Sequence, residues 1–336
     1  MPRRRHVDSE SPPSTPLDAC ARLSGARPLV AHAGWNAPLL AAVLVALSAA
    51  PAYAAACCLS SSAFGVGRLA RWEQFAVIVG TSTSPVAGRW DEQGAWHVNM
   101  PGYSENEWRA QLSALGAVHP RLQLSGRAPL LLTQKSSGDQ HEVSGGLGDS
   151  QLAVRYEPIY QGEYEYVPEV ALTAGMTVPI GRTAGVSKTI LGSDVTSRGA
   201  WVPSASVTTE LARNFWFVQL GGGVTFPLPM AGAEPGTTQQ FGLGWQATIA
   251  GGAEVTKGVV LSLVGRYAYE GPLRVDGQPL MQSQAWDFGG ALNAAWKFGS
   301  HWTLQGGADV GLFASGLGAN RQGRFTGSLA VRYAYF

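Results

Sequence analysis

The C-terminal half of the chain alternates apolar and polar residues with a period of two. From Gln240 onward, one face carries large apolar side chains and the other carries small or polar ones. Successive side chains of a β-strand point to opposite faces, so this period predicts strands with one apolar surface each. The apolar face of this first run comprises Phe241, Leu243, Trp245, Ala247 and Ile249.

About twelve such runs follow one another from residue 72 to the C-terminus, and each predicts a strand. Their length of about ten to fourteen residues exceeds that of a typical globular strand but suits a tilted membrane span. The predicted strands are 72–82, 106–117, 121–133, 147–157, 166–178, 200–212, 215–227, 239–253, 258–270, 284–297, 301–313 and 323–336.

The predicted connections alternate between short and long. Tight links are expected at 119–120, 213–214, 256–257 and 299–300, with a somewhat longer one at 157–165. Short periplasmic turns and long extracellular loops are typical of outer-membrane barrels, so both termini are expected on the periplasmic side. The long loops are expected near 83–105, 134–146, 179–199, 228–238, 271–283 and 314–322.

Aromatic residues concentrate near the ends of these runs, as Trp216, Phe226, Trp286, Trp296 and Trp302 illustrate. A soluble β-sandwich also alternates, but aromatic girdles at both strand ends are typical of membrane barrels. The sequence therefore predicts a closed antiparallel transmembrane β-barrel of about twelve strands in a bacterial outer membrane, with outer-membrane lipids as partners.

The N-terminus has the features of a secretory signal peptide. Residues 37–50 form an apolar stretch, and Ala52, Tyr53 and Ala54 supply an A-x-A cleavage site. We expect 1–54 to be a removed leader, 55–71 a periplasmic lead-in or plug, and 72–336 the barrel. The polar stretch 1–36 is longer than a usual basic leader, which either a misplaced start codon or an extended leader explains.

Composition and cysteine content exclude several classes of protein. The formal net charge of +1 gives no reason to expect a nucleic-acid partner. Besides Cys20 in the leader, the chain has only the adjacent pair Cys57 and Cys58, which excludes a four-cysteine metal site. The pair is compatible with lipid attachment, a strained disulfide or two free thiols. No metal or other cofactor is expected.

The predicted lumen-facing positions carry charges of both signs. Mixed signs suggest salt-bridge ladders or a weakly selective interior rather than an ion filter of one sign. Many other inward positions are Gly or Ala, which leave space for a ligand, a water path or a plug. The charged candidates are Arg109, Arg121, Arg127, Asp149, Arg155, Glu169, Glu210, Arg266, Glu270, Asp287, Lys297, Asp309 and Arg332.

The lead-in is more apolar than a merely solvated tail, because it contains Phe64, Val66 and Leu69. We expect it to fold into the periplasmic mouth and narrow the lumen, as plugs do in other barrels. A mobile periplasmic tail is the alternative.

A short motif carries a family resemblance. Gly145–Asp149 (GGLGD), followed by the predicted strand Ser150–Tyr156 (SQLAVRY), resembles a pattern of the outer-membrane transporter family named after the meta-pathway of phenol degradation. That family is akin to fatty-acid and hydrocarbon channels of the outer membrane. The resemblance implies passive uptake of small hydrophobic or aromatic solutes. A general diffusion porin and a structural or adhesive outer-membrane protein are the alternatives.

An enzymatic function is not expected. Outer-membrane phospholipases use serine, histidine and asparagine, and the nearest pieces here are His141 and Ser144. A spacing of three places these two residues on opposite faces of a strand, where the histidine cannot activate the serine.

The C-terminus predicts an assembly signal. Phe336 is a terminal aromatic residue, and Tyr335 and Tyr333 precede it on an alternating apolar face. We therefore expect the barrel-assembly machinery to be a partner through Phe336, although its usual apolar partners at alternate positions are here Ala334 and Arg332.

Overall fold

The computed structural model describes residues 67–160, 163, 166–232 and 236–336. The predicted leader, the cysteines and the plug candidates Phe64 and Val66 lie outside the described residues. The described chain consists of strands and turns with one 3-10 turn, η3 (Ala184–Val186). No helix in the described part is long and apolar enough to cross a membrane.

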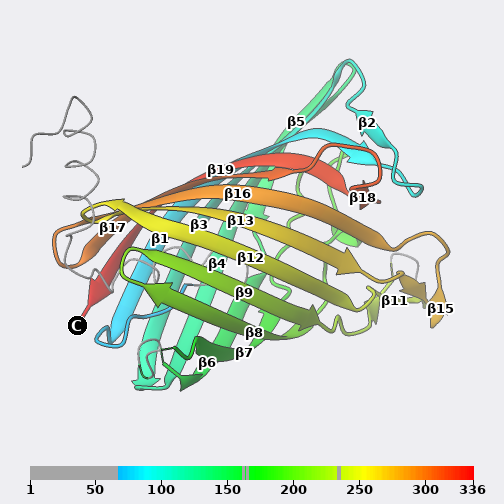
Figure 1. Cartoon of the computed structure of the whole chain (residues 1–336). Helices are drawn as coiled ribbons and strands as arrows, with labels where there is room; N and C mark the ends of the chain where they lie inside the picture. Colours follow the sequence, from blue (N-terminus) through cyan, green and yellow to red (C-terminus); the bar gives the residue numbers. More distant parts are fainter. Residues whose placement is uncertain (1–66, 161–162, 164–165, 233–235) are drawn as a thin grey trace, which may run out of the picture. The chain divides into compact units, whose positions relative to one another are not determined.

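Twelve antiparallel strands form a closed wall, in which each strand pairs with the next along the chain and β1 pairs with β19 (Figure 1). The predicted closed barrel is confirmed, and most strand starts lie within about three residues of their predicted positions. The wall strands are β1 (Phe75–Trp90), β3 (Tyr103–His119), β4 (Leu122–Ser137), β6 (Ser150–Ile159), β7 (Glu169–Val178), β8 (Val202–Arg213), β9 (Trp216–Thr225), β12 (Gly244–Thr256), β13 (Val259–Glu270), β16 (Ala285–Phe298), β17 (Trp302–Gly311) and β19 (Gln322–Tyr335).

The connections divide the barrel into two ends. Tight turns follow β3, β8, β12 and β16, and we call this the turn end; the chain enters β1 and leaves β19 there. The opposite, loop end carries short additional strands. There, β2 (Trp96–Val98) pairs with β1 and β18 (Gly318–Ala319) with β16. A separate small sheet contains β10 (Met230–Ala231), β11 (Thr238–Gln240), β14 (Arg274–Val275) and β15 (Gln278–Pro279).

The prediction of a loop at 134–146 was wrong. β4 continues to Ser137 and turns directly into β5 (Gln140–Leu147), so that the β4–β5 hairpin extends the wall at the loop end (Figure 1). Leu130 pairs with Leu147 and Arg127 pairs with Gln151, so three steps along β4 match four along β5 and β6. β5 and β6 are therefore two halves of one strand, with a bulge at Gly148 and Asp149.

The loop between β7 and β8 covers the far edge of β5. The amides of Ile190 and Leu191 donate hydrogen bonds to the Glu142 carboxylate, and the Thr196 hydroxyl donates to the Leu147 carbonyl at 2.7 Å. Covering an exposed edge prevents pairing with another chain. Within the loop, Asp194 accepts bonds from the Ser187 hydroxyl, the Lys188 amide and Arg182, which together lower the pKa of its carboxyl.

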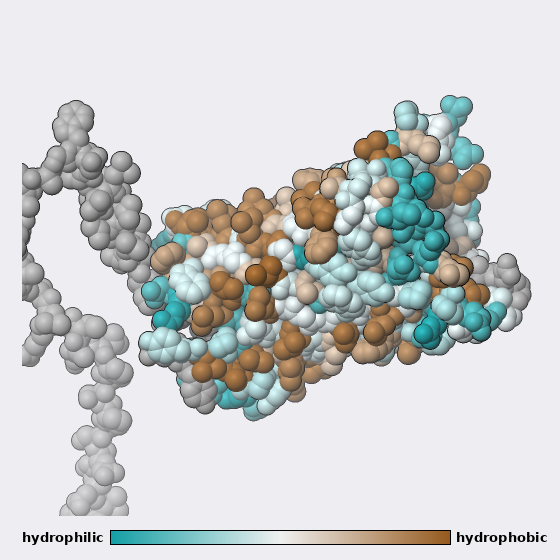
Figure 2. Space-filling model, turned by 45° about the vertical axis from the view of Figure 1, so that its right-hand side comes forward, coloured by the Kyte–Doolittle hydropathy of each residue, from teal (hydrophilic) through white to brown (hydrophobic). Residues whose placement is uncertain are grey.

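Large apolar side chains cover the outer face of the barrel. Leu263 on β13 and Leu292 on the neighbouring strand β16 are paired in register, and they are 67% and 54% exposed. Figure 2 shows apolar and weakly polar residues along the side of the barrel, with hydrophilic ones gathered toward the loop end. Because all wall strands are paired, such a surface can lie in lipid, as in outer-membrane proteins.

Exposed aromatic residues form two girdles about ten residues apart along the strands, which for tilted strands is roughly 25 Å along the barrel axis. This spacing matches the apolar band of outer-membrane barrels. The girdle at the turn end contains Phe75, Phe215, Trp216, Trp296, Phe298, Trp302 and Tyr335, and the one at the loop end contains Trp108, Trp201, Phe226, Trp245, Phe288 and Phe325.

We predict that Leu263→Arg lowers the free energy of unfolding in lipid by about 2–4 kcal/mol, because Leu263 lies midway between the girdles. Ser328→Arg, on the inner face of β19, should have little effect. Urea titration of both variants in lipid vesicles measures the difference. Equal losses would contradict the inward and outward assignment of the strands.

Candidate functional site

Most of the predicted lumen-facing charges share the inner face of the wall. Asp149 lies in the bulge between β5 and β6, and Arg121 lies in the β3–β4 turn, where its guanidinium donates to the Pro158 carbonyl and to Glu163. The other candidates occupy wall strands, on the face opposite the exposed apolar side chains. They are Arg109, Arg127, Arg155, Glu169, Glu210, Arg266, Glu270, Asp287, Lys297, Asp309 and Arg332.

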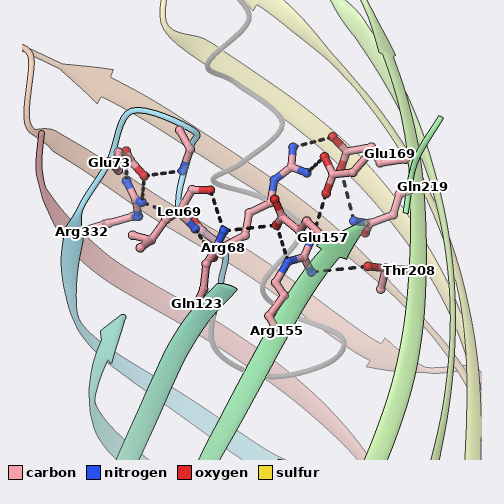
Figure 3. A network of polar contacts seen from close by, with 12 residues as sticks. Arg68, Leu69, Glu73, Gln123, Arg155, Glu157, Glu169, Thr208, Gln219 and Arg332 are labelled. Carbon is pink, nitrogen blue, oxygen red and sulfur yellow. Dashed lines mark hydrogen bonds and ion pairs between the residues drawn. The ribbon is translucent and has the colours of Figure 1, made fainter. Parts of the chain in front are cut away.

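At the turn end, the chain before β1 runs inside the barrel. Arg68 is 3% exposed and its guanidinium bonds the carboxylates of both Glu169 on β7 and Glu210 on β8 (Figure 3). The Arg68 to Glu210 distance is 2.8 Å. The segment that contains Arg68 is therefore tied to two neighbouring wall strands.

The same carboxylates are shared with a wall arginine. Arg155 on β6 bonds Glu169 at 2.8 Å and Glu157 at 2.7 Å. The side-chain amide of Gln219 donates to Glu210 at 3.2 Å, and that of Gln123 donates to Glu157 at 3.2 Å. Each buried carboxylate thus has a charged partner, an amide partner or both, as burial of charge requires.

A second ion pair fixes the same segment to the end of the barrel chain. Arg332 on β19 bonds both oxygens of Glu73 and also donates to the Arg68 carbonyl (Figure 3). Leu69 donates its amide hydrogen to the Gln123 side chain at 3.0 Å, and its side chain packs against Ala76, Leu115 and Ala334. Of the plug candidates, Leu69 is thus buried inside the barrel end.

The loop end carries a separate charged network. Glu270 accepts from Arg198 at 3.0 Å and from Arg321 at 3.1 Å. Arg266 reaches Asp309 at 3.0 Å and Asp287 at 3.7 Å. On the opposite side, Arg324 bonds Glu105 and Glu107, and Glu107 also accepts from Arg109. Most of the charged residues predicted for the interior take part in ion pairs in the structure.

Between the two networks lies a cavity of about 360 Å³ on the side formed by β4, β6, β7, β8, β9 and β12. Gly67 and Arg68 form its floor at the turn end. Its lining is mainly hydroxyl, amide and guanidinium groups, and none of the described residues that line it contributes a carboxylate. The polar side chains are Arg68, Gln123, Ser125, Arg127, Gln151, Arg155, Thr173, Thr177, Ser204, Ser206, Thr208, Gln219, Thr225 and Gln246.

The histidine considered for catalysis lies outside this cavity. His141 on β5 shares a 2.7 Å hydrogen bond with the Ser136 hydroxyl, whereas Ser144 pairs with Thr133. Within the described ranges, no carboxylate or amide bonds the other ring nitrogen of His141. The part of the chain that the structure describes also contains no group of three or more His, Cys, Asp or Glu residues that could hold a metal ion.

Several residues of the networks were not among the sequence candidates. Glu157 is two residues after Arg155, so both side chains point to the same face of the strand, and the two-residue period could have identified it as inward-facing. Glu105 and Arg321 lie at or beyond the ends of the predicted strands. Arg68 has no local signal, because its partners Glu169 and Glu210 are 101 and 142 residues away.

No family model matches the chain, and no curated protein matches it. The fold is similar to that of the COG4313 outer membrane channel from Pseudomonas putida F1, with a TM-score of 0.64 and 17% identity over 78% of this chain and 96% of that chain. Looser similarities include the translocator domain of the autotransporter NalP from Neisseria meningitidis (TM-score 0.44, 12% identity, 78% and 88% covered) and the CymD monoaromatic hydrocarbon channel (TM-score 0.41, 8% identity, 78% and 89% covered).

We predict that Glu169→Gln lowers the free energy of unfolding by roughly 3–5 kcal/mol, because Arg68 and Arg155 would then share too little buried negative charge. Arg109→Gln is the matched control. It should cost less than about 1 kcal/mol, since Arg109 is 42% exposed and Glu107 retains Arg324. Urea titration in lipid vesicles measures both, and similar small losses would show that the buried network contributes little.

Proposed function

We propose that this protein is a channel of the bacterial outer membrane through which small solutes diffuse passively. Two observations support the proposal: a closed barrel with an apolar outer face, and a cavity between its two charged networks. The fold likeness to an outer membrane channel adds to this support. No cofactor has a part in such diffusion.

The lining of the cavity narrows the solute class. The resemblance at Gly145–Asp149 implies hydrophobic or aromatic solutes. The cavity has few apolar side chains, such as Leu115 and Ala153, among many hydroxyl and amide groups. A purely hydrophobic molecule would leave those groups without hydrogen bonds, which is costly. We therefore infer that the preferred solutes are small aromatic molecules that carry polar groups.

General diffusion is the second candidate, and the polar lining with its mixed charges favours it. The small volume of the cavity argues against general diffusion. A cavity of about 360 Å³ lies at the lower end of the range for sites that hold one small molecule, whereas porins leave an open aqueous channel.

The N-terminal segment closes the turn end in this proposal. Gly67 and Arg68 lie on the floor of the cavity, and Arg68, Leu69 and Glu73 are all bonded to the barrel interior. We infer that the lead-in acts as a plug or constriction at the periplasmic mouth. A mobile tail could not retain these buried contacts at its end.

The partners follow from the surface. Outer-membrane lipids would contact the apolar band, and the exposed Tyr335 with Phe336 would present a terminal aromatic signal to the barrel-assembly machinery. Phe336 itself lies beside His301, with ring centroids 5.0 Å apart, and Tyr333 lies 4.9 Å from Trp302.

Liposome permeation tests the proposed solute class. Vesicles that contain the protein should admit a small polar aromatic solute of low membrane permeability, such as phenylalanine, faster than the disaccharide sucrose. Protein-free vesicles provide the background. Equal acceleration of sucrose would favour the general porin, and no acceleration of any solute would contradict a channel.

Planar bilayers test the plug. The double variant Arg68→Gln, Glu210→Gln keeps the net charge and removes the bond between the segment and β8, while Arg155 continues to pair with Glu169. We predict a higher single-channel conductance than in the wild type. Arg109→Gln is the control for a lumen substitution, and unchanged conductance of a folded double variant would contradict the plug.

A further inference from the structure

We propose that Arg127 is the anion-binding residue of the cavity and takes the carboxylate of a small organic acid. This inference rests on the proposed channel function and names the charged group of its solute. Arg127 lies on the inner face of β4, paired in register with Ser113 of β3 and Gln151 of β6, and its side chain lines the cavity.

Arg127 differs from the other inward arginines. The guanidinium groups of Arg109, Arg155 and Arg266 each lie within 3.0 Å of a carboxylate. Among the residues that the structure describes, Arg127 has no hydrogen-bond or ion-pair partner. The charged side chain that acts on it is Arg109, which has the same sign. An anion bound beside Arg127 would therefore offset the repulsion between Arg127 and Arg109, and it would not have to compete with a carboxylate of the protein.

An arginine without a partner inside the barrel needs an explanation. A charge in a half-buried site costs free energy unless an opposite charge or water compensates it. The cavity could have a glutamine here, as it does at Gln123, Gln151, Gln219 and Gln246 on its other strands. An arginine retains this cost without any structural gain in the described contacts, which points to a ligand.

The surroundings of Arg127 suit a carboxylate. The planar guanidinium can bind both oxygens through two parallel hydrogen bonds. Ser125 and Thr177 add hydroxyl donors to the lining, and no carboxylate among the described lining residues would repel an anion. The Oε1 atom of Gln151 is buried and has no hydrogen-bond partner among the described residues, so it can accept a hydrogen bond from a hydroxyl group of the solute.

The carboxylates of the floor do not occupy this site. Glu157, Glu169 and Glu210 are bonded to Arg155 and Arg68. Gln123, which contacts that network, is four residues from Arg127 along β4, or roughly 13 Å at the rise of an extended strand. Two arginines for three carboxylates leave the floor slightly negative, so an anion is expected at Arg127 rather than at Arg68.

Equilibrium binding and channel block together test the site. Benzoate binding to the full-length folded barrel in detergent is measured by calorimetry, and benzoate block of the current is measured in planar bilayers. For Arg127→Gln, the dissociation constant and the half-blocking concentration should each rise by at least about tenfold, as expected for loss of a charge-assisted bond. Arg127→Lys should recover part of the affinity, because it restores the charge without the planar fork.

Arg266→Gln is the matched control, since it removes the same charge from the lumen but lies outside the cavity lining. It should change the benzoate affinity by less than about twofold, well below the loss of a direct charged hydrogen bond. Benzyl alcohol should bind wild type and Arg127→Gln equally. A benzoate affinity that is the same in wild type and Arg127→Gln, or that falls equally in Arg266→Gln, would overturn the site.

The two proposals can fail separately. Arg127-dependent binding of benzoate without any conductance would contradict the channel and leave the anion site. Conductance whose block by benzoate does not depend on Arg127 would leave the channel and contradict the site.

Discussion

The burial of Arg68 between Glu169 and Glu210 is the interaction on which the interior of this barrel depends. The backbone of a barrel wall satisfies its own hydrogen bonds, but charged side chains buried on the inner face cost free energy unless an opposite charge compensates them. Arg68 comes from outside the wall and bonds two of its strands. Glu210 is 2% exposed, and among the described residues its hydrogen-bond partners are Arg68 and the Gln219 amide. The N-terminal segment therefore compensates two buried carboxylates of the wall, and it also forms the floor of the cavity.

This arrangement separates the tasks of the two faces. The outer face meets lipid through residues such as Leu263 and Leu292, and this requirement produces the two-residue period in the sequence. The inner face has no such uniform solvent. Its polar groups form ion pairs at both ends and leave a polar cavity between them. In our proposal, the chemistry offered to a solute is set by the few groups, such as Arg127, that have no partner among the described residues.

The two-residue alternation predicted the wall strands correctly, because contact with lipid requires an apolar outer face. It did not predict the strands that extend beyond the membrane. Residues 134–146 are polar on both faces, yet they form the end of β4 and most of β5, because a strand in water above the membrane needs no apolar face. The alternation also assigned Glu169, Glu210 and Arg155 to the inner face. It could not reveal that Arg68 joins them, because that contact links segments more than 100 residues apart through tertiary structure alone.

Hydrogen exchange at the amides of Leu69 and Ala70 tests most directly whether the segment is part of the barrel. These amides donate to Gln123 at 3.0 Å and to Glu73 at 2.7 Å inside the turn end. In lipid vesicles at neutral pH, both should exchange far more slowly than amides of an unstructured peptide, and Glu169→Gln should accelerate them before the wall strands. Exchange of the wild-type amides at the unprotected rate would show that the segment is a free tail and contradict the account.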